Sequence, residues 1–477
     1  MSPTTGRRAW LALAALALPA LLASLELTVT HLALPAIGAD LDASATQLLW
    51  IVDVYAFLLA GSLIAMGVWG DRIGRRRMLL VGAAAYGVTS ALAAYAPTAN
   101  TLIGARALMG LAASTLMPST LALAAAIFPE PRRRATAIGV IVASVSAGTA
   151  IGPLVGGWLL DNAWWGSAFL VAVPVMAIVL IAGPLLLPAL PPSRTSHPDL
   201  ASALLSLLAV LPTVYGLKRA AVEGADLAAA AAIAVGLVAA VAFVRRQRRP
   251  DPFVDLRLFS QPTLRIALAT LALGIGVLWA SNLAVAQYLQ LVRGLSPLEA
   301  GLWTAPPALG VIAGSLAAPR LARRTLPAYV IAAGLAISAV GYIILATAGS
   351  LATVVAAAIV ISTGLGPMMS LSTDLAIGSA PPERTGAAAA LASAAPQLGG
   401  ALGVAVLGSV IAATYRHHAP AAPTLTAGAD QASRDAYVAG IHVAAAVSAV
   451  LITLAAATLV RTAAASRRRA GQAGSRT

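Results

Sequence analysis

The 477-residue chain contains no cysteine, a single lysine and few charged side chains of either sign. Without cysteine it has no disulfide, thiolate nucleophile or cysteine-based metal site. Charged residues make up only 10% of the sequence, and no internal stretch is polar enough to form a soluble domain. A G-x₄-G-K-[ST] loop is also missing, so the chain does not couple ATP hydrolysis itself. Since paired carboxylates, a nucleophile elbow and a metal-ligand cluster are absent too, we expect no enzyme activity, cofactor or metal ion.

Apolar residues dominate the remainder of the sequence. Hydrophobic residues account for 59% of the chain, and long apolar runs recur from end to end. Each run is long enough for a helix to cross about 30 Å of hydrocarbon. We therefore predict an all-α polytopic membrane protein with 14 transmembrane helices. The predicted spans are residues 10–36, 47–69, 78–97, 102–127, 135–160, 164–188, 199–218, 227–245, 264–290, 298–319, 327–347, 351–375, 386–413 and 437–460.

The formal charge of +14 is unevenly distributed between the loops that join these spans. On the side that holds both termini lie 25 Lys and Arg residues, against 5 on the other side. Because basic loops remain in the cytoplasm, we expect both termini on the cytoplasmic side of a bacterial inner membrane. The basic charge thus marks topology, and nucleic-acid binding is not expected. The first span is too long for a signal peptide and contains Glu26 and His31.

The spans divide into three parts along the chain. Residues 1–190 hold six spans and end in a proline-rich segment. Residues 191–263 hold two plain apolar spans and a basic cytoplasmic linker, and residues 264–477 hold six more spans and a basic tail. Transporters are commonly built from repeated halves that bind substrate near the membrane midplane. This order therefore predicts two six-helix bundles with an inserted helix pair.

The pattern G-x₃-G-P-x₂-G-G lies within the fifth predicted span. Glycines four residues apart share one helical face and let another helix approach closely, while the proline bends the helix. Such spacing by itself indicates packing. The full string resembles the antiporter motif of drug-exporting members of the major facilitator superfamily, which implies a helix that shapes the central cavity and limits leak. The motif residues are Gly148, Gly152, Pro153, Gly156 and Gly157.

A second pattern, G-x₂-G-D-R-x-G-R-R-R, follows the second predicted span. A topogenic stop signal explains its arginines, but it explains neither Asp71 nor the glycines Gly70 and Gly74, which permit a tight turn. The string resembles the signature of the same superfamily in this cytoplasmic loop. The resemblance implies that the acid joins a charge network that latches the bundles in the outward-facing state. The motif residues are Gly67, Gly70, Asp71, Arg72, Gly74, Arg75 and Arg76.

Arg106 lies inside the fourth predicted span, four residues before Gly110. An arginine in hydrocarbon is costly unless it is paired or hydrated, so its presence indicates function. Its place near the outer end of the span leaves snorkelling to the membrane surface as an alternative. The R-x₃-G spacing resembles the superfamily's fourth-span motif, which implies a role of the arginine in proton transfer.

Three carboxylates fall inside predicted spans: Glu26, Asp53 and Asp374. A carboxyl group in hydrocarbon is costly to ionise without a partner, so it suits proton transfer and offers a counter-charge to a lipophilic cation. The residues around Glu26 resemble the first-span motif of the 14-span drug:proton antiporters, which usually has Asp at that position. Asp53 matches the second-span aspartate of pumps for quaternary ammonium compounds, dyes and methyl viologen. For Asp374, near a helix end, a structural role is equally open.

Five further residues are candidates for a drug pocket. His31 lies about 140° around its helix from Glu26, and a hydrogen-bonded packing role is its alternative. The aromatic candidates suit either an interfacial belt or cation–π contact with a drug. The glutamine lies in span 13, where relatives often carry carboxylates, so we expect protonation to depend on the N-terminal bundle. The five residues are His31, Tyr55, Trp279, Tyr288 and Gln397.

Together these motifs resemble those of the 14-span drug:proton antiporters. The resemblance implies a monomeric exporter that exchanges protons for lipophilic cationic compounds, driven by the proton gradient and surrounded by membrane lipid. A dedicated exporter of one natural-product antibiotic is an alternative, because the Arg- and Ala-rich composition is typical of a GC-rich genome. A nutrient importer is disfavoured by the fifth-span motif.

Overall fold

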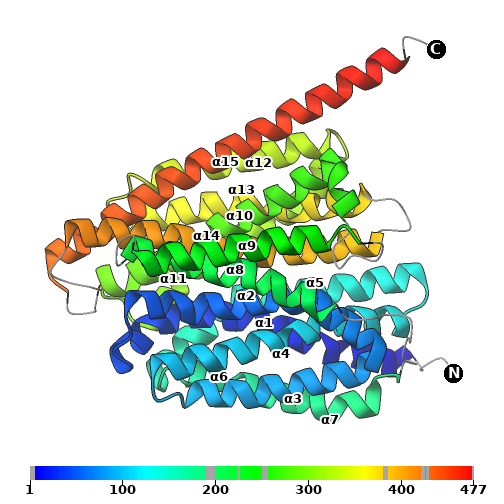
Figure 1. Ribbon diagram of the computed structural model, residues 1–477, viewed down its shortest axis with the longest axis horizontal. Helices are drawn as coiled ribbons and strands as arrows, with labels where there is room; N and C mark the ends of the chain where they lie inside the picture. The colour runs from blue at the N-terminus through cyan, green and yellow to red at the C-terminus, as the bar shows by residue number, and fades with distance from the viewer. Residues whose placement is uncertain are drawn as a thin grey trace. The chain divides into compact units, whose positions relative to one another are not determined.

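The computed structural model describes residues 6–189, 199–222, 226–249, 256–379, 385–419, 425 and 429–474. Every regular element in these ranges is helical, which confirms the predicted all-α class (Figure 1). Among the described residues, thirteen helices are long and apolar enough to cross a membrane. The predicted count of fourteen is not confirmed, because the apolar part of one helix in the inserted pair covers only Ala201–Leu217.

The chain forms two compact units. The first unit consists mainly of Met1–Phe253 and contains α1 (Gly6–Asp40), α2 (Ala45–Ile73), α3 (Arg75–Ala94), α4 (Ala99–Ile127), α5 (Pro131–Asn162), α6 (Ser167–Leu170), α7 (Ala172–Leu186), α8 (Leu200–Val222) and α9 (Leu227–Arg246). The second unit contains η1 (Leu256–Ser260), α10 (Pro262–Gln287), the π-helical turn η2 (Tyr288–Val292), α12 (Pro327–Leu345), α13 (Leu351–Gly378), α14 (Thr385–His418) and α15 (Gln431–Gly474). α11 (Pro297–Ala322) contributes residues to both units.

Local sequence signals set several helix ends. Ser44, Thr98 and Ser350 begin α2, α4 and α13 with capping boxes, in which the cap hydroxyl accepts a backbone N–H and the third helical residue bonds back to the cap. Gly74 ends α2 and starts α3 with φ at 100°, a conformation that costs little only for glycine. The helices therefore begin and end where the side chains can satisfy the terminal backbone groups.

Packing within the first unit pairs helices that are distant in sequence. α1 lies along α5, α2 along α4, and α3 along both α4 and α7. The span predicted over residues 164–188 corresponds to α6 and α7, and the backbone of Val171 between them is itself helical (φ −53°, ψ −31°). The two helices therefore form one apolar span, Ser167–Leu186. α6 contributes a side chain to the site described below.

In the second unit, glycine permits a close contact between two helices. α10 packs along α14, and α12 packs against α13 and α15. A Cβ atom at Gly276 of α10 would lie 2.6 Å from the carbonyl oxygen of Gly399 on α14. These two helices therefore approach each other closely because neither has a side chain at the contact.

The outward faces of many helices are apolar. Ile181, Val238 and Leu316 are 68%, 70% and 64% exposed, respectively. A soluble protein rarely shows so many large apolar side chains to water, whereas lipid tails solvate them well. The exposed surface agrees with a chain that crosses the membrane many times.

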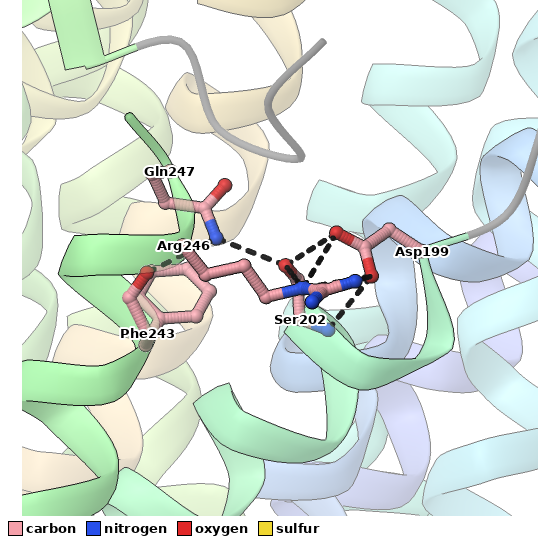
Figure 2. A network of polar contacts seen from close by, with 5 residues as sticks. All are labelled: Asp199, Ser202, Phe243, Arg246 and Gln247. Carbon is pink, nitrogen blue, oxygen red and sulfur yellow. Dashed lines mark hydrogen bonds and ion pairs between the residues drawn. The ribbon is translucent and has the colours of Figure 1, made fainter. Parts of the chain in front are cut away.

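The inserted helices α8 and α9 pack along each other as a hairpin, and α8 also contacts α2. Asp199, just before α8, forms an ion pair with Arg246 at the end of α9, with 2.8 Å between Oδ1 and Nη2 (Figure 2). Arg246 Nε donates to Ser202 Oγ at 3.1 Å, and Gln247 Nε2 donates to the same hydroxyl at 3.0 Å. The hydrogen bond from Arg246 is the main reason that the pKa of Asp199 lies well below its ordinary value.

A second ion pair joins α8 to α9 at the opposite end of the hairpin. Arg219 Nη2 lies 2.9 Å from Asp226 Oδ2, and Asp226 caps α9 by accepting the backbone N–H of Ala229 at 2.8 Å. That backbone hydrogen bond is the first cause of the lowered pKa of Asp226, and Arg219 adds to it. Both ends of the inserted hairpin are therefore held by charge pairs.

Candidate functional site

Arg106 on α4 and Glu26 on α1 form a buried ion pair inside the first unit. Arg106 Nη1 donates to Glu26 Oε1, and the two side chains are 0% and 2% exposed. Arg106 Nε donates to the carbonyl oxygen of Ile51 on α2, at 2.9 Å. One guanidinium thus links three helices. Its burial excludes the snorkelling alternative, since the side chain does not reach the surface of the protein.

An ion pair at this depth is costly to maintain. Removing two charges from water costs several kcal/mol per ion, and well-packed apolar residues at such a site are often at least as stable. Ionisable side chains inside membrane segments are accordingly rare and tend to mark pathways for ions, protons or substrates. The pair Glu26–Arg106 is therefore the strongest candidate for a functional centre in the described part of the chain.

Further polar atoms around this pair have unused hydrogen-bonding capacity. Thr30 lies one helical turn after Glu26, and His31 is close enough to Arg106 to interact with it electrostatically. Buried polar groups are normally hydrogen bonded, so a cluster of unbonded ones suits a proton, water or a polar ligand. The buried atoms of this site that have no hydrogen bond are Glu26 Oε2, Thr30 Oγ1, His31 Nε2, Tyr55 Oη and Arg106 Nη2.

The glycines of the fifth-span motif face the helix that carries Glu26. A Cβ atom at Gly148 would collide with the backbone of Leu21, and one at Gly156 would lie 2.9 Å from Val29 Cγ2. α5 therefore packs directly on α1 on both sides of Glu26, which the sequence predicted as close helix contact without naming the partner. The other motif residues Gly152, Pro153 and Gly157 are buried on α5.

The loop motif after the second span is only partly as predicted. Gly74 makes the turn alone, whereas Gly70 lies within α2, so the predicted turn role of Gly70 is wrong. Arg76 Nη1 donates to the carbonyl oxygen of Leu187 at 3.0 Å and so satisfies the carboxyl end of α7. The side chain of Asp71 lies outside the described part of the structure, and its latch role stays a prediction. Gly67 and Arg72 belong to α2, and Arg75 begins α3.

The other two intramembrane acids have contrasting environments. Asp53 on α2 is 0% exposed. It lies two residues from both Ile51 and Tyr55, so its side chain leaves the helix on a different side from theirs. Asp374 is exposed near the carboxyl end of α13, in the second unit. The structure therefore places Asp53 in the same unit as the ion pair and Asp374 in the other.

The remaining pocket candidates are divided between the two units. His31 and Tyr55 belong to the first unit, where the Tyr55 ring lies against Arg106, whereas Trp279, Tyr288 and Gln397 belong to the second unit. Trp279 on α10 packs against Gly400 of α14, and Tyr288 is 5% exposed in the π turn η2. Gln397 is half-buried on α14. Roles of these three in drug binding stay predictions.

The histidines His417 and His418 are the last residues of α14. Their ring centroids are 5.2 Å apart. The described ranges contain no group of three or more metal-binding side chains. The pair therefore extends the helix beyond the predicted span.

Many apolar helices around a buried ion pair define a multi-span membrane transporter. The sequence matches the Major Facilitator Superfamily over residues 16–404, and the chain belongs to this superfamily. It is therefore a transporter and not an enzyme.

Characterised relatives and solved structures agree with this assignment. The chain is 42% identical to the multidrug efflux pump LfrA of Mycolicibacterium smegmatis, over 89% of this chain and 86% of the relative. It is 34% identical to the methyl viologen resistance protein SmvA of Salmonella typhimurium, over 86% and 83% of the two chains. Its fold is similar to that of a bacterial homologue of the human lysosomal transporter Spinster, with a TM-score of 0.66 and 20% identity over 95% and 97% of the chains.

Proposed function

We propose that this protein is a proton-coupled antiporter that exports lipophilic cationic compounds by alternating access. The observation that carries the proposal is the buried pair of Glu26 and Arg106, which lies in a chain similar to a multidrug efflux pump and to a methyl viologen resistance protein. Quaternary ammonium compounds, cationic dyes and related drugs are the expected substrates. The energy source is the proton gradient, and no cofactor takes part.

Charge balance at the pair explains how a proton and a cation exclude each other. With Glu26 ionised, the pair is neutral, and the carboxylate attracts a lipophilic cation in competition with Arg106. A proton on Glu26 removes that attraction and leaves the positive charge of Arg106, which repels the cation at short range in a medium of low dielectric constant. Mutual exclusion of this kind is the coupling that an antiporter requires.

The same proposal places the protein in the bacterial inner membrane as a monomer surrounded by lipid. Both termini lie in the cytoplasm, as the bias of 25 basic residues to 5 favours. The fifth-span glycines let α5 pack tightly against α1, the helix that carries Glu26. This contact supports a role of α5 in preventing the leak of protons or substrate past Glu26.

Proteoliposomes containing the purified protein test the proposal. Without ATP, ethidium or methyl viologen should move in the direction opposite to the protons that flow down an imposed pH gradient. Glu26→Gln should abolish this movement, while Phe57→Leu, at a buried position on α2, should not. Transport that follows a sodium gradient and ignores the pH gradient would contradict proton exchange.

A dedicated exporter of one natural product stays the alternative for the substrate range. A susceptibility panel of cationic dyes, quaternary ammonium compounds and antibiotics in an efflux-deficient host separates the two. Broad protection against cations supports the proposal, and protection against a single antibiotic supports the alternative.

A further inference from the structure

Two aromatic rings lie close to the guanidinium of Arg106. Its central carbon lies 4.4 Å from the ring centroid of Tyr55 on α2 and 5.6 Å from that of Phe169 on α6. Both distances are within the range of a cation–π interaction, about 6 Å. The two side chains are 3% and 0% exposed, so water does not weaken the attraction. Arg106 thus has three sources of stabilisation: a carboxylate, a backbone carbonyl and two ring faces.

The backbone of each aromatic residue makes a specific contact with a neighbouring helix. Gly110, one turn after Arg106, lets α2 approach so closely that a Cβ atom there would lie 2.5 Å from the carbonyl oxygen of Tyr55. Ser90 Oγ on α3 donates to the carbonyl oxygen of Phe169 at 2.7 Å. These contacts fix the backbone positions from which the two rings project.

A second support for Phe169 comes from the end of α1. Trp165 packs edge-on against Phe169, with ring centroids 6.3 Å apart. Its Nε1 donates to Oδ2 of Asp40, the last residue of α1, at 2.6 Å. Since α1 also carries Glu26, the helix of the carboxylate is linked to the ring that faces its arginine.

The rings act differently on the two protonation states of Glu26. When Glu26 is ionised, it compensates the charge of Arg106, and the electron-rich ring faces oppose the nearby carboxylate. When Glu26 is protonated, Arg106 is a lone cation in an apolar interior, and the ring faces and the carbonyl oxygen of Ile51 are its remaining stabilisation. The aromatic pair therefore lowers the cost of neutralising Glu26.

We propose that Tyr55 and Phe169 are positioning residues whose rings stabilise the charge of Arg106 and thereby set the pH range over which proton exchange runs. This inference rests on the proposed function, because it assigns the two rings to the coupling step at Glu26. Neither residue needs to contact the drug.

The test measures ethidium movement in proteoliposomes as a function of pH. Phe169→Leu and Tyr55→Leu remove a ring, so the midpoint of the pH profile should shift to lower pH by about half to one unit. Tyr55→Phe and Phe169→Tyr keep the ring and should retain the wild-type midpoint. Phe57→Leu is the matched control, because Phe57 is a buried phenylalanine on α2 with 1% exposure.

The outcomes separate this inference from the function on which it rests. An unshifted midpoint in both leucine variants, with Glu26→Gln inactive, overturns the role of the rings and leaves proton coupling intact. Wild-type exchange in Glu26→Gln overturns the proposed function itself. Where a leucine variant does not fold, Phe169→Met supplies a ring-free side chain of similar length, and the same shift is expected of it.

Discussion

Glu26 of α1 and Arg106 of α4 are 80 residues apart in sequence, and they form an ion pair in which neither side chain is more than 2% exposed. Each charge compensates the other for the hydration that it loses on burial. Removal of one partner therefore leaves an uncompensated charge in an apolar interior, whereas removal of both does not. Stability and proton coupling are thus separable at this pair.

Glu26→Gln should lower the stability of the solubilised protein by about 3–5 kcal/mol, because Arg106 remains charged and buried. The double variant Glu26→Gln with Arg106→Gln should recover most of that loss, since it contains no buried charge at the site. It should nevertheless carry out no exchange driven by a pH gradient. Thermal unfolding in detergent and transport in proteoliposomes measure the two effects.

Glu26→Asp provides the matching control for charge. It keeps the carboxylate but shortens the side chain by one methylene, so transport should persist with an altered substrate profile. Exchange at the wild-type rate in the double amide variant would show that the coupling acid lies elsewhere.

The sequence predicted Glu26 and Arg106 as site residues, but it did not predict that they pair. Glu26 and Arg106 stand out as charges in apolar spans, yet helical periodicity does not say which faces of distant helices meet. Phe169 was missed, because one aromatic residue in an apolar segment looks like packing. Gly148 predicted close contact, but only the structure identifies α1 as its partner.

Gly148→Ala should destabilise the protein by about 1–3 kcal/mol and impair transport, because the new Cβ atom collides with the backbone of Leu21. A backbone atom cannot move aside as a flexible side chain can. Gly104→Ala on α4 is the control, since nothing lies within 4 Å of its added Cβ atom. Equal thermal stability of the two variants would contradict the contact between α5 and α1.

Asp199→Asn should weaken the inserted hairpin by about 1 kcal/mol, a modest figure because the ion pair is partly exposed. The lowered pKa of Asp199 in the folded protein means that its contribution is complete above the unfolded pKa, about 3.9, and declines as the pH falls toward the folded value. The stability difference between wild type and variant should therefore be constant from about pH 5 to 8 and shrink below about pH 4. Thermal unfolding at several pH values measures it, and a difference that grows on acidification would contradict the sign.

Topology can be tested with alkaline phosphatase fusions, which are active only outside the cytoplasm. A fusion after residue 470 should be inactive, and a fusion within residues 414–436 should be active, because 25 basic residues lie on the side of the termini and 5 on the other. The reverse pattern would contradict the cytoplasmic placement of both termini.

Asp53 and Asp374 offer a matched comparison of two aspartates inside membrane-spanning helices. Asp53 is 0% exposed in the unit that holds the ion pair, whereas Asp374 is exposed near the end of α13 in the other unit. Asp53→Asn should therefore slow the efflux of cations by about tenfold or more, which corresponds to about 1.4 kcal/mol of lost electrostatic stabilisation.

Divalent methyl viologen should be affected more than monovalent ethidium, because Arg106 already compensates part of the negative charge of Glu26 and a dication requires a second carboxylate. Neutral substrates should be affected least. Asp374→Asn should transport all of them at rates close to wild type, since the exposed carboxylate lies outside the unit that holds the ion pair. If Asp374→Asn fails and Asp53→Asn does not, the second charge for cation recognition lies on α13.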